Sequence, residues 1–139
     1  MNVSVMAVVA ATAVQFVAGA IWYMPVFGKL WGEMFGFDKL SKAEQKKQQA
    51  GMMPWMVLQL VMTIFISYAL AWLAANNIST SIYKLTLIAW LGFFVPTQVS
   101  AVIFGGTEAR WIKRRILIMA GGSLFTLMVG ALVIQAIQK

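Results

Sequence analysis

The sequence predicts an all-α integral membrane protein, with four transmembrane helices in an up-down bundle and a short interfacial helix in the first loop. Of its 139 residues 61% are hydrophobic and only 11% are charged, against about 25% charged residues in soluble domains. Four stretches carry no charge at all: residues 1–28, 48–83, 85–107 and 116–138. A helix crosses the hydrocarbon core in roughly 20 residues, so we expect a single transmembrane domain over residues 1–139.

Helix is the expected conformation because lipid forces each backbone N–H and C=O to find its partner within the same segment. We expect the four helices to span Val3–Val26, Met52–Ala75, Leu85–Phe104 and Ile116–Ile137. The first segment lacks the basic residues that open a cleavable signal peptide, so it is expected to remain as a helix. Pro54 fits the first turn of the second helix, where its missing N–H costs little.

The first loop has an amphipathic pattern of its own. Its apolar residues share one helical face: Leu30, Trp31, Met34 and Phe35. This face predicts a short helix that lies in the membrane interface. Ser41 and Glu44 have the spacing of a capping box, which predicts a second short helix from about Lys42.

The distribution of Lys and Arg predicts the orientation, because cytoplasmic loops are enriched in these residues. Nine of the 11 basic residues lie in the first and third loops. Only Lys84 and Lys139 lie on the other side. We therefore expect a multi-pass protein of the bacterial plasma (inner) membrane, with loops 1 and 3 cytoplasmic and both termini outside.

The same basic residues are candidate contacts for anionic lipid head groups. The candidates are Lys29, Arg110, Lys113, Arg114 and Arg115. The simpler alternative is a solvated basic loop that only sets the topology. Because the net charge of +7 is concentrated in membrane loops, no nucleic-acid partner is expected.

The composition excludes most catalytic chemistry. There is no His and no Cys, so the usual zinc, copper, haem and iron–sulfur ligands are missing. The four carboxylates all fall in predicted loops: Glu33, Asp38, Glu44 and Glu108. We therefore expect no catalytic residue, metal or cofactor, and no enzyme activity.

Polar side chains at membrane depth form the candidate interior path or pocket. The set is Gln15, Trp22, Tyr23, Gln59, Thr63, Ser67, Pro96, Thr97 and Gln98. Such residues commonly hold membrane helices together, but they could also line a path for a solute. Pro96 adds a break in the third helix, since its ring displaces the carbonyl of Gly92. That break either improves packing or creates a binding or permeation site.

The fourth helix carries a run of small residues at intervals of four, namely Gly122, Thr126 and Gly130. Small residues allow two helix backbones to approach closely. The run could face another helix of the bundle or a partner chain. We expect a homo-oligomer, most simply a dimer, or a subunit of a membrane complex.

Two stretches resemble the signatures of a family of small bacterial membrane proteins, domain of unknown function 1761. They are residues 19–31 (GAIWYMPVFGKLW) and residues 90–97 (WLGFFVPT). The chain departs in the fourth helix, where Met119-Ala120-Gly121-Gly122 replaces an Asn-Ala-Gly-Tyr-like stretch. The resemblance implies a four-helix inner-membrane protein and supplies no activity or ligand. Read physically, both motifs either fix helix depth or form an aromatic-lined pocket shared by helices one and three.

Two functions remain open on the sequence. In the first, the chain is a non-catalytic structural, assembly or lipid-organising subunit, and its polar stripes only join helices. In the second, it is a small channel or carrier for a neutral or weakly polar solute. No charged residue lies at membrane depth, which argues against a proton relay or a voltage sensor.

Overall fold

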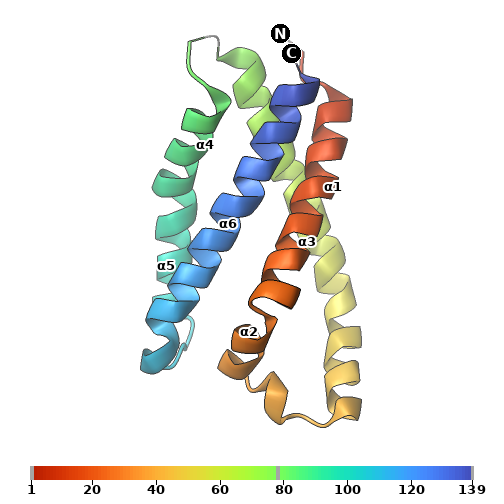
Figure 1. Ribbon diagram of the computed structural model, residues 1–139, viewed down its shortest axis with the longest axis vertical. Coiled ribbons are helices and arrows are strands. Elements are labelled where there is room, and N and C mark those ends of the chain that lie inside the picture. The colour runs from red at the N-terminus through yellow and green to blue at the C-terminus, as the bar shows by residue number, and fades with distance from the viewer. Residues whose placement is uncertain (1, 78, 139) are drawn as a thin grey trace.

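The computed structural model describes residues 2–77 and 79–138, and all regular structure in these ranges is helical. The α-helices are α1 (Val5–Ile21), α2 (Gly28–Met34), α3 (Lys42–Asn76), α4 (Ile82–Ala89), α5 (Val95–Phe104) and α6 (Ala109–Ile137). Two π-helices, η1 (Trp22–Val26) and η3 (Trp90–Phe94), continue α1 and α4, and η2 (Phe37–Lys39) is a 3₁₀ turn. Both ends of the chain lie at the same end of the bundle (Figure 1).

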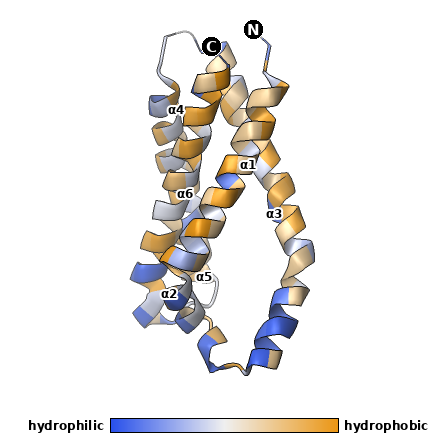
Figure 2. Cartoon of the chain, turned by 45° about the vertical axis from the view of Figure 1, so that its right-hand side comes forward, coloured by the Kyte–Doolittle hydropathy of each residue, from blue (hydrophilic) through white to orange (hydrophobic). Residues whose placement is uncertain are grey.

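Four continuous helical segments are long and apolar enough to cross a membrane. They are Val5–Val26, Lys42–Asn76, Ile82–Phe104 and Ala109–Ile137. Hydrophobic residues predominate along all four, whereas hydrophilic residues gather at the end that holds α2 (Figure 2). The helix lengths and composition are those of a membrane protein. The short amphipathic helix predicted in the first loop is present as α2.

The second long helix begins ten residues before the predicted Met52, and this boundary was wrong. The capping box is present, since Ser41 Oγ accepts from the Glu44 N–H at 3.3 Å and Glu44 Oε2 accepts from the Ser41 N–H at 2.9 Å. The helix that it starts does not stop but continues to Asn76. Pro54 therefore lies inside α3, not in a first turn. The point at which charged residues stop shows where the apolar segment begins, but the helix begins earlier in the chain.

The fourth helix is corrected in the same direction. It starts at Ala109, seven residues before the predicted Ile116. The third segment starts at Ile82 instead of Leu85, after the N-cap Ser81. Basic residues are compatible with a helix, and those at the start of α6 are helical. The prediction placed each helix start after the last charged residue and therefore made the helices too short.

α6 is the central helix, in contact with α1, α3, α4 and α5. Figure 1 shows it running between α1 on one side and α4 and α5 on the other. The core that it forms with α1 and α3 contains many small residues, including Ala7, Ala11, Ala71 and Ala131. At the end of the bundle where both termini lie, Gln138 links three helices. It accepts from the Ser4 N–H at 3.0 Å and donates to Ala71 O at 2.7 Å.

At the opposite end of the bundle, the N-terminal half of α3 does not pack against the other helices. Every residue from 46 to 62 is exposed, whereas Thr63, Ser67 and Ala71 further along α3 are buried. Figures 1 and 2 show this half of the helix standing apart from α1 and α6. We call residues 46–62 the unpartnered segment. The end of the molecule that holds α2 and the α5–α6 loop is called the basic end.

Candidate functional site

The first π-helix presents an indole to the backbone of α6. Trp22, the first residue of η1, donates its Nε1–H to Ile118 O at 2.9 Å. Its ring also packs against Phe27, with centroids 4.8 Å apart, and against Phe125 of α6 at 5.7 Å. Since a helical carbonyl has a second lone pair, Ile118 O can accept this bond without giving up its place in α6.

The second π-helix also presents an indole to the backbone of α6, on the other side of that helix. Trp90, the first residue of η3, donates its Nε1–H to Ala120 O at 2.9 Å and lies 3.0 Å from Ser123 Oγ. Ser123 Oγ in turn donates to Gln98 Oε1 at 3.2 Å. The predicted break before Pro96 is thus a π-helical turn, after which Pro96 sits in the first turn of α5.

Glycines of α6 make the approach of Trp22 possible. A Cβ on Gly121 would lie 2.9 Å from Trp22 Cζ2, and one on Gly122 would lie 2.8 Å from Trp22 Cδ1. The Tyr23 hydroxyl would be 3.2 Å from the Cβ on Gly122. Any side chain at these two positions would occupy space that the indole fills.

The predicted packing face of α6 lies against α1 of the same chain. Besides Gly122 against Trp22, a Cβ on Gly130 would come within 2.6 Å of Gln15 Cδ. Thr126, between them, has its Cγ2 only 3.8 Å from the Cβ position of Gly19. These residues therefore serve contacts within the bundle.

Gln15 forms the polar contact at the centre of the bundle. It is 4% exposed, and its Nε2–H donates to the fully buried Ser67 Oγ at 2.7 Å. The hydroxyl of Thr63, one turn before Ser67, donates to Gln59 O of the same helix at 2.8 Å. These side chains hydrogen-bond to each other or to their own helix.

The remaining predicted path residues do not join this group. Gln59 is exposed in the unpartnered segment, and Pro96 and Thr97 are exposed on α5. The Thr97 hydroxyl donates to Phe93 O of its own helix. Gln98, through Ser123, belongs with Trp90. The predicted set is thus divided between a Gln15–Ser67 contact, two tryptophan contacts and outward-facing residues.

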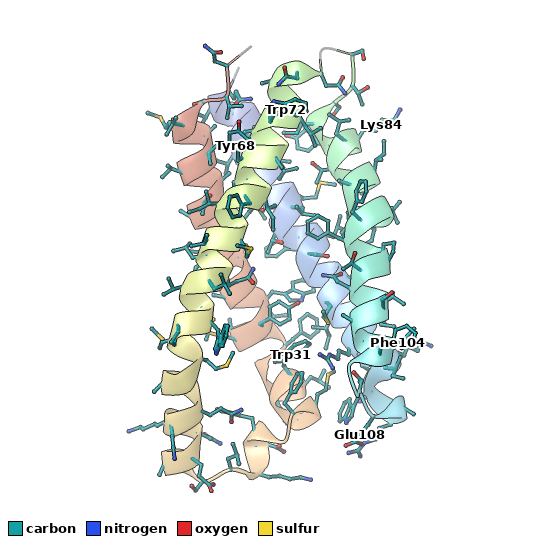
Figure 3. All side chains as sticks on the ribbon, turned by 180° about the vertical axis from the view of Figure 1, so that it is seen from behind. Trp31, Tyr68, Trp72, Lys84, Phe104 and Glu108 are labelled. Atoms are coloured by element: carbon teal, nitrogen blue, oxygen red, sulfur yellow. The ribbon has the colours of Figure 1, made fainter. Side chains whose placement is uncertain are left out.

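At the basic end, Trp31 of α2 and Phe35, the C-cap of α2, lie against an arginine of α6. The Arg115 Cζ lies 5.0 Å from the centroid of the Phe35 ring and 6.0 Å from that of Trp31, while its Nη1 donates to Thr107 Oγ1 at 2.6 Å. The Trp31 ring packs against Phe35 and, from the other side, against Tyr23, with centroids 5.2 and 5.0 Å apart. We call Trp31, Phe35, Thr107 and Arg115 the Arg115 cluster. Figure 3 shows Trp31 on α2, at the end of the molecule opposite Trp72 and Lys84.

The other basic residues of α6 are arranged differently. Arg110 and Arg114 both lie over the ring of Trp111, at 5.4 and 5.5 Å from its centroid. Arg110 also pairs with Glu108 at 2.7 Å, which is the one ion pair within residues 2–77 and 79–138. Lys29 and Lys113, which complete the predicted lipid contacts, are exposed.

The chemistry of these groups is that of binding and packing. Within the described ranges, no group of three or more His, Cys, Asp or Glu side chains could hold a metal ion. The buried polar atoms are amides, hydroxyls and indole N–H groups, which stabilise contacts through hydrogen bonds. Among the basic side chains of the described ranges, Arg115 is the one that is partly buried.

The chain was compared with known protein families, curated proteins and solved structures. The family described as "Protein of unknown function (DUF1761)" matches residues 6–135, which is all but the first five and last four residues. The chain belongs to this family. No curated protein and no solved structure matched it.

Membership of the family confirms the resemblance stated from residues 19–31 and 90–97. Each of these stretches contains one of the π-helices, η1 or η3. Sequence reasoning missed Trp90 and Ser123 as contact residues, although Trp90 opens its motif's π-helix as Trp22 does. The interval of four between Trp111 and Arg115, which places them on one face of a helix, was a further available signal.

Proposed function

We propose that the protein is a non-catalytic, multi-pass inner-membrane protein that organises lipid in the cytoplasmic leaflet. In this proposal the basic end is cytoplasmic, both termini are outside, and α2 lies in the interface. Nine of the 11 basic residues at the basic end support this orientation. The charge distribution also favours anionic lipids as partners.

The observation that carries the proposal is the exposure of the unpartnered segment. Residues 46–49 are polar, but from Met52 to Met62 every residue except Gln59 is apolar or Pro. At a rise of 1.5 Å per residue these eleven positions cover about 16 Å, which is close to one leaflet of the hydrocarbon core. An apolar helix exposed on all sides over that depth needs an apolar surrounding.

Lipid is the occupant that best fits this segment. The segment begins with Lys46 and Lys47, and Lys29 on α2 and Arg115 on α6 lie toward the same end of the molecule. An acyl chain beside α3 would therefore have its head group among cationic side chains, and an anionic head group would complement their charge. The proposal thus gives one role to the apolar segment and the basic end.

The hydrogen bonds of the interior support this role over the alternative of a channel or carrier. A solute path would need polar side chains free to contact the solute, yet Gln15 and Ser67 are hydrogen-bonded to each other at 2.7 Å. Gln98 is engaged by Ser123 on the far side of α6 from α1. No observation favours a continuous path between these two contacts.

Site-directed spin labelling tests the proposal, and the absence of cysteine makes single-site labelling straightforward. Nitroxides placed one at a time at residues 52–62, in phosphatidylglycerol–phosphatidylethanolamine vesicles, should show high accessibility to oxygen and low accessibility to a water-soluble nickel complex. Ala71→Cys is the buried control and should be inaccessible to both relaxants. Lys47→Cys is the aqueous control and should be accessible to nickel.

Two outcomes would contradict the proposal. High nickel accessibility along the Gln59 face would indicate a water-filled space and support the transport alternative. Low accessibility to both relaxants on one face would indicate that a second copy or another protein covers α3.

A further inference from the structure

Within residues 2–77 and 79–138, no carboxylate pairs with the positive charge of Arg115. Arg115 is half-buried on the second turn of α6, and the ion pair present in the described residues is that of Arg110 with Glu108. The neighbours of its guanidinium are two aromatic rings and the Thr107 hydroxyl. A cation removed from water in this way is costly unless an anion or polar acceptors accompany it.

Its hydrogen-bonding capacity is also unfilled. A guanidinium has five N–H donors, and within the described residues one bond is made, from Nη1 to Thr107 Oγ1 at 2.6 Å. Arg115 Nε is buried without a partner, and so is the indole Nε1 of Trp111, four residues earlier on the same face of α6. Unsatisfied buried donors are rare in native proteins. Because Nε is covered by protein, a ligand would meet the terminal Nη groups, three of whose four N–H donors have no partner in the described residues.

The side chain is held in place before any ligand arrives. Phe35 and Trp31 lie against the guanidinium at 5.0 and 6.0 Å, and Thr107 anchors it from the α5–α6 loop. A planar guanidinium with free donors fits the oxygens of a phosphate group in a two-point arrangement. Lys113 and Arg114, just before Arg115 on the same helix, are exposed, and the aromatic ring beside Arg114 is that of Trp111 on its own helix.

We propose that the Arg115 cluster is a binding site for the phosphodiester of an anionic lipid head group. This inference rests on the proposed lipid-organising function and names the group that the lipid presents. Arg115 binds the phosphodiester with its free terminal N–H groups, and Trp31 and Phe35 exclude water from one face of the contact. The acyl chains extend from there toward the apolar part of the unpartnered segment.

Native mass spectrometry of the full chain tests this site. The protein in mild detergent is mixed with equal amounts of palmitoyl-oleoyl phosphatidylglycerol and palmitoyl-oleoyl phosphatidylcholine, and the retained ratio is measured. Phosphatidylcholine also carries a phosphodiester, but its choline cation neutralises the head group and weakens the attraction to Arg115. Arg115→Gln should lower the preference for phosphatidylglycerol by about tenfold, the loss expected for a charge-assisted hydrogen bond. Arg114→Gln removes the same charge from an exposed position of the same helix and should change the ratio less than twofold.

Two further arms complete the design. Arg115→Lys keeps the charge and controls for misfolding of the Arg115→Gln variant. Its preference for phosphatidylglycerol should lie between those of the wild type and Arg115→Gln, because an ammonium lacks the planar fork of a guanidinium. Inorganic phosphate at a large excess should not displace the lipid. Displacement by inorganic phosphate would show that the site takes free phosphate and would overturn the lipid assignment.

The outcomes separate this inference from the function on which it rests. Lipid retained by the wild type without preference between the two head groups would refute the Arg115 site and leave lipid binding standing. Equal losses in Arg114→Gln and Arg115→Gln would also refute the site, since general surface charge would then suffice. A wild type that retains neither lipid would refute both.

Discussion

Trp22 and Trp90 donate to carbonyls of α6 that are only two residues apart, Ile118 O and Ala120 O, both at 2.9 Å. At 3.6 residues per turn these carbonyls point about 200° apart around the helix. The two indoles therefore hold α6 from nearly opposite sides. Each indole opens a π-helix of its own segment, so the two distortions and the two contacts are parts of one arrangement.

Replacement of either tryptophan should destabilise the bundle. We expect Trp22→Phe and Trp90→Phe each to lower the free energy of unfolding by about 1–3 kcal/mol, because a hydrogen bond and part of the ring's packing are lost. Unfolding in detergent, followed by circular dichroism, measures the change. Trp55→Phe is the matched control, since Trp55 is 62% exposed and its loss should cost less than about 0.5 kcal/mol.

A methyl group at Gly122 should also be destabilising. The Cβ of Gly122→Ala would lie 2.8 Å from Trp22 Cδ1, and overpacking of this kind costs about 1–3 kcal/mol. Gly51→Ala in α3 meets nothing within 4 Å and should be neutral or stabilise by up to about 1 kcal/mol, as Ala is the better helix former. Equal effects of the two substitutions on unfolding would show that the indole does not occupy this position.

The contact between Gln15 and Ser67 can be measured by a double-mutant cycle. Gln15→Leu, Ser67→Ala and the double variant should give a coupling energy of about 0.6 kcal/mol, the average for such bonds in membrane helices. The same unfolding assay supplies the four free energies. A coupling near zero would mean that the 2.7 Å bond does not stabilise the folded state.

The proposed orientation predicts different reactivity at the two ends of the molecule. On intact cells Gln48→Cys should be protected from a membrane-impermeant maleimide, and Ser79→Cys should react. Both should react after the membrane is permeabilised, which controls for burial of the thiol. The reverse pattern on intact cells would place the basic end outside.

The sequence was sufficient to predict the four apolar helices, the first-loop helix and the family, because these follow from long-range composition and from two motifs. It was insufficient for the helix starts. The capping box correctly predicted a helix from about Lys42, but as a short helix separate from the one expected at Met52. α3 runs without a break from Lys42 to Asn76, and a polar stretch does not show whether a helix ends within it.

The grouping of polar side chains was less predictable for a similar reason. The spacing of four places three polar residues on one face of α3, namely Gln59, Thr63 and Ser67. Thr63 and Ser67 are buried but Gln59 is exposed, because α3 separates from the neighbouring helices between Gln59 and Thr63. Spacing along one helix says nothing of where a second helix departs. Arg115 was included among the basic candidates, but its aromatic neighbours come from α2, more than 75 residues earlier in the chain.

The central position of α6 has a consequence for how the protein is made. The helix that contacts α1, α3, α4 and α5 follows the other three membrane segments in the chain, and it is synthesised after them because chains emerge from the ribosome N-terminus first. Until Ala109–Ile137 is inserted, Trp22 and Trp90 have no carbonyl of α6 to bind. α1 and α3 can already pair through contacts such as that of Gln15 with Ser67, but this pair and the α4–α5 segment are joined mainly through α6. The bundle can therefore close only after α6 is inserted.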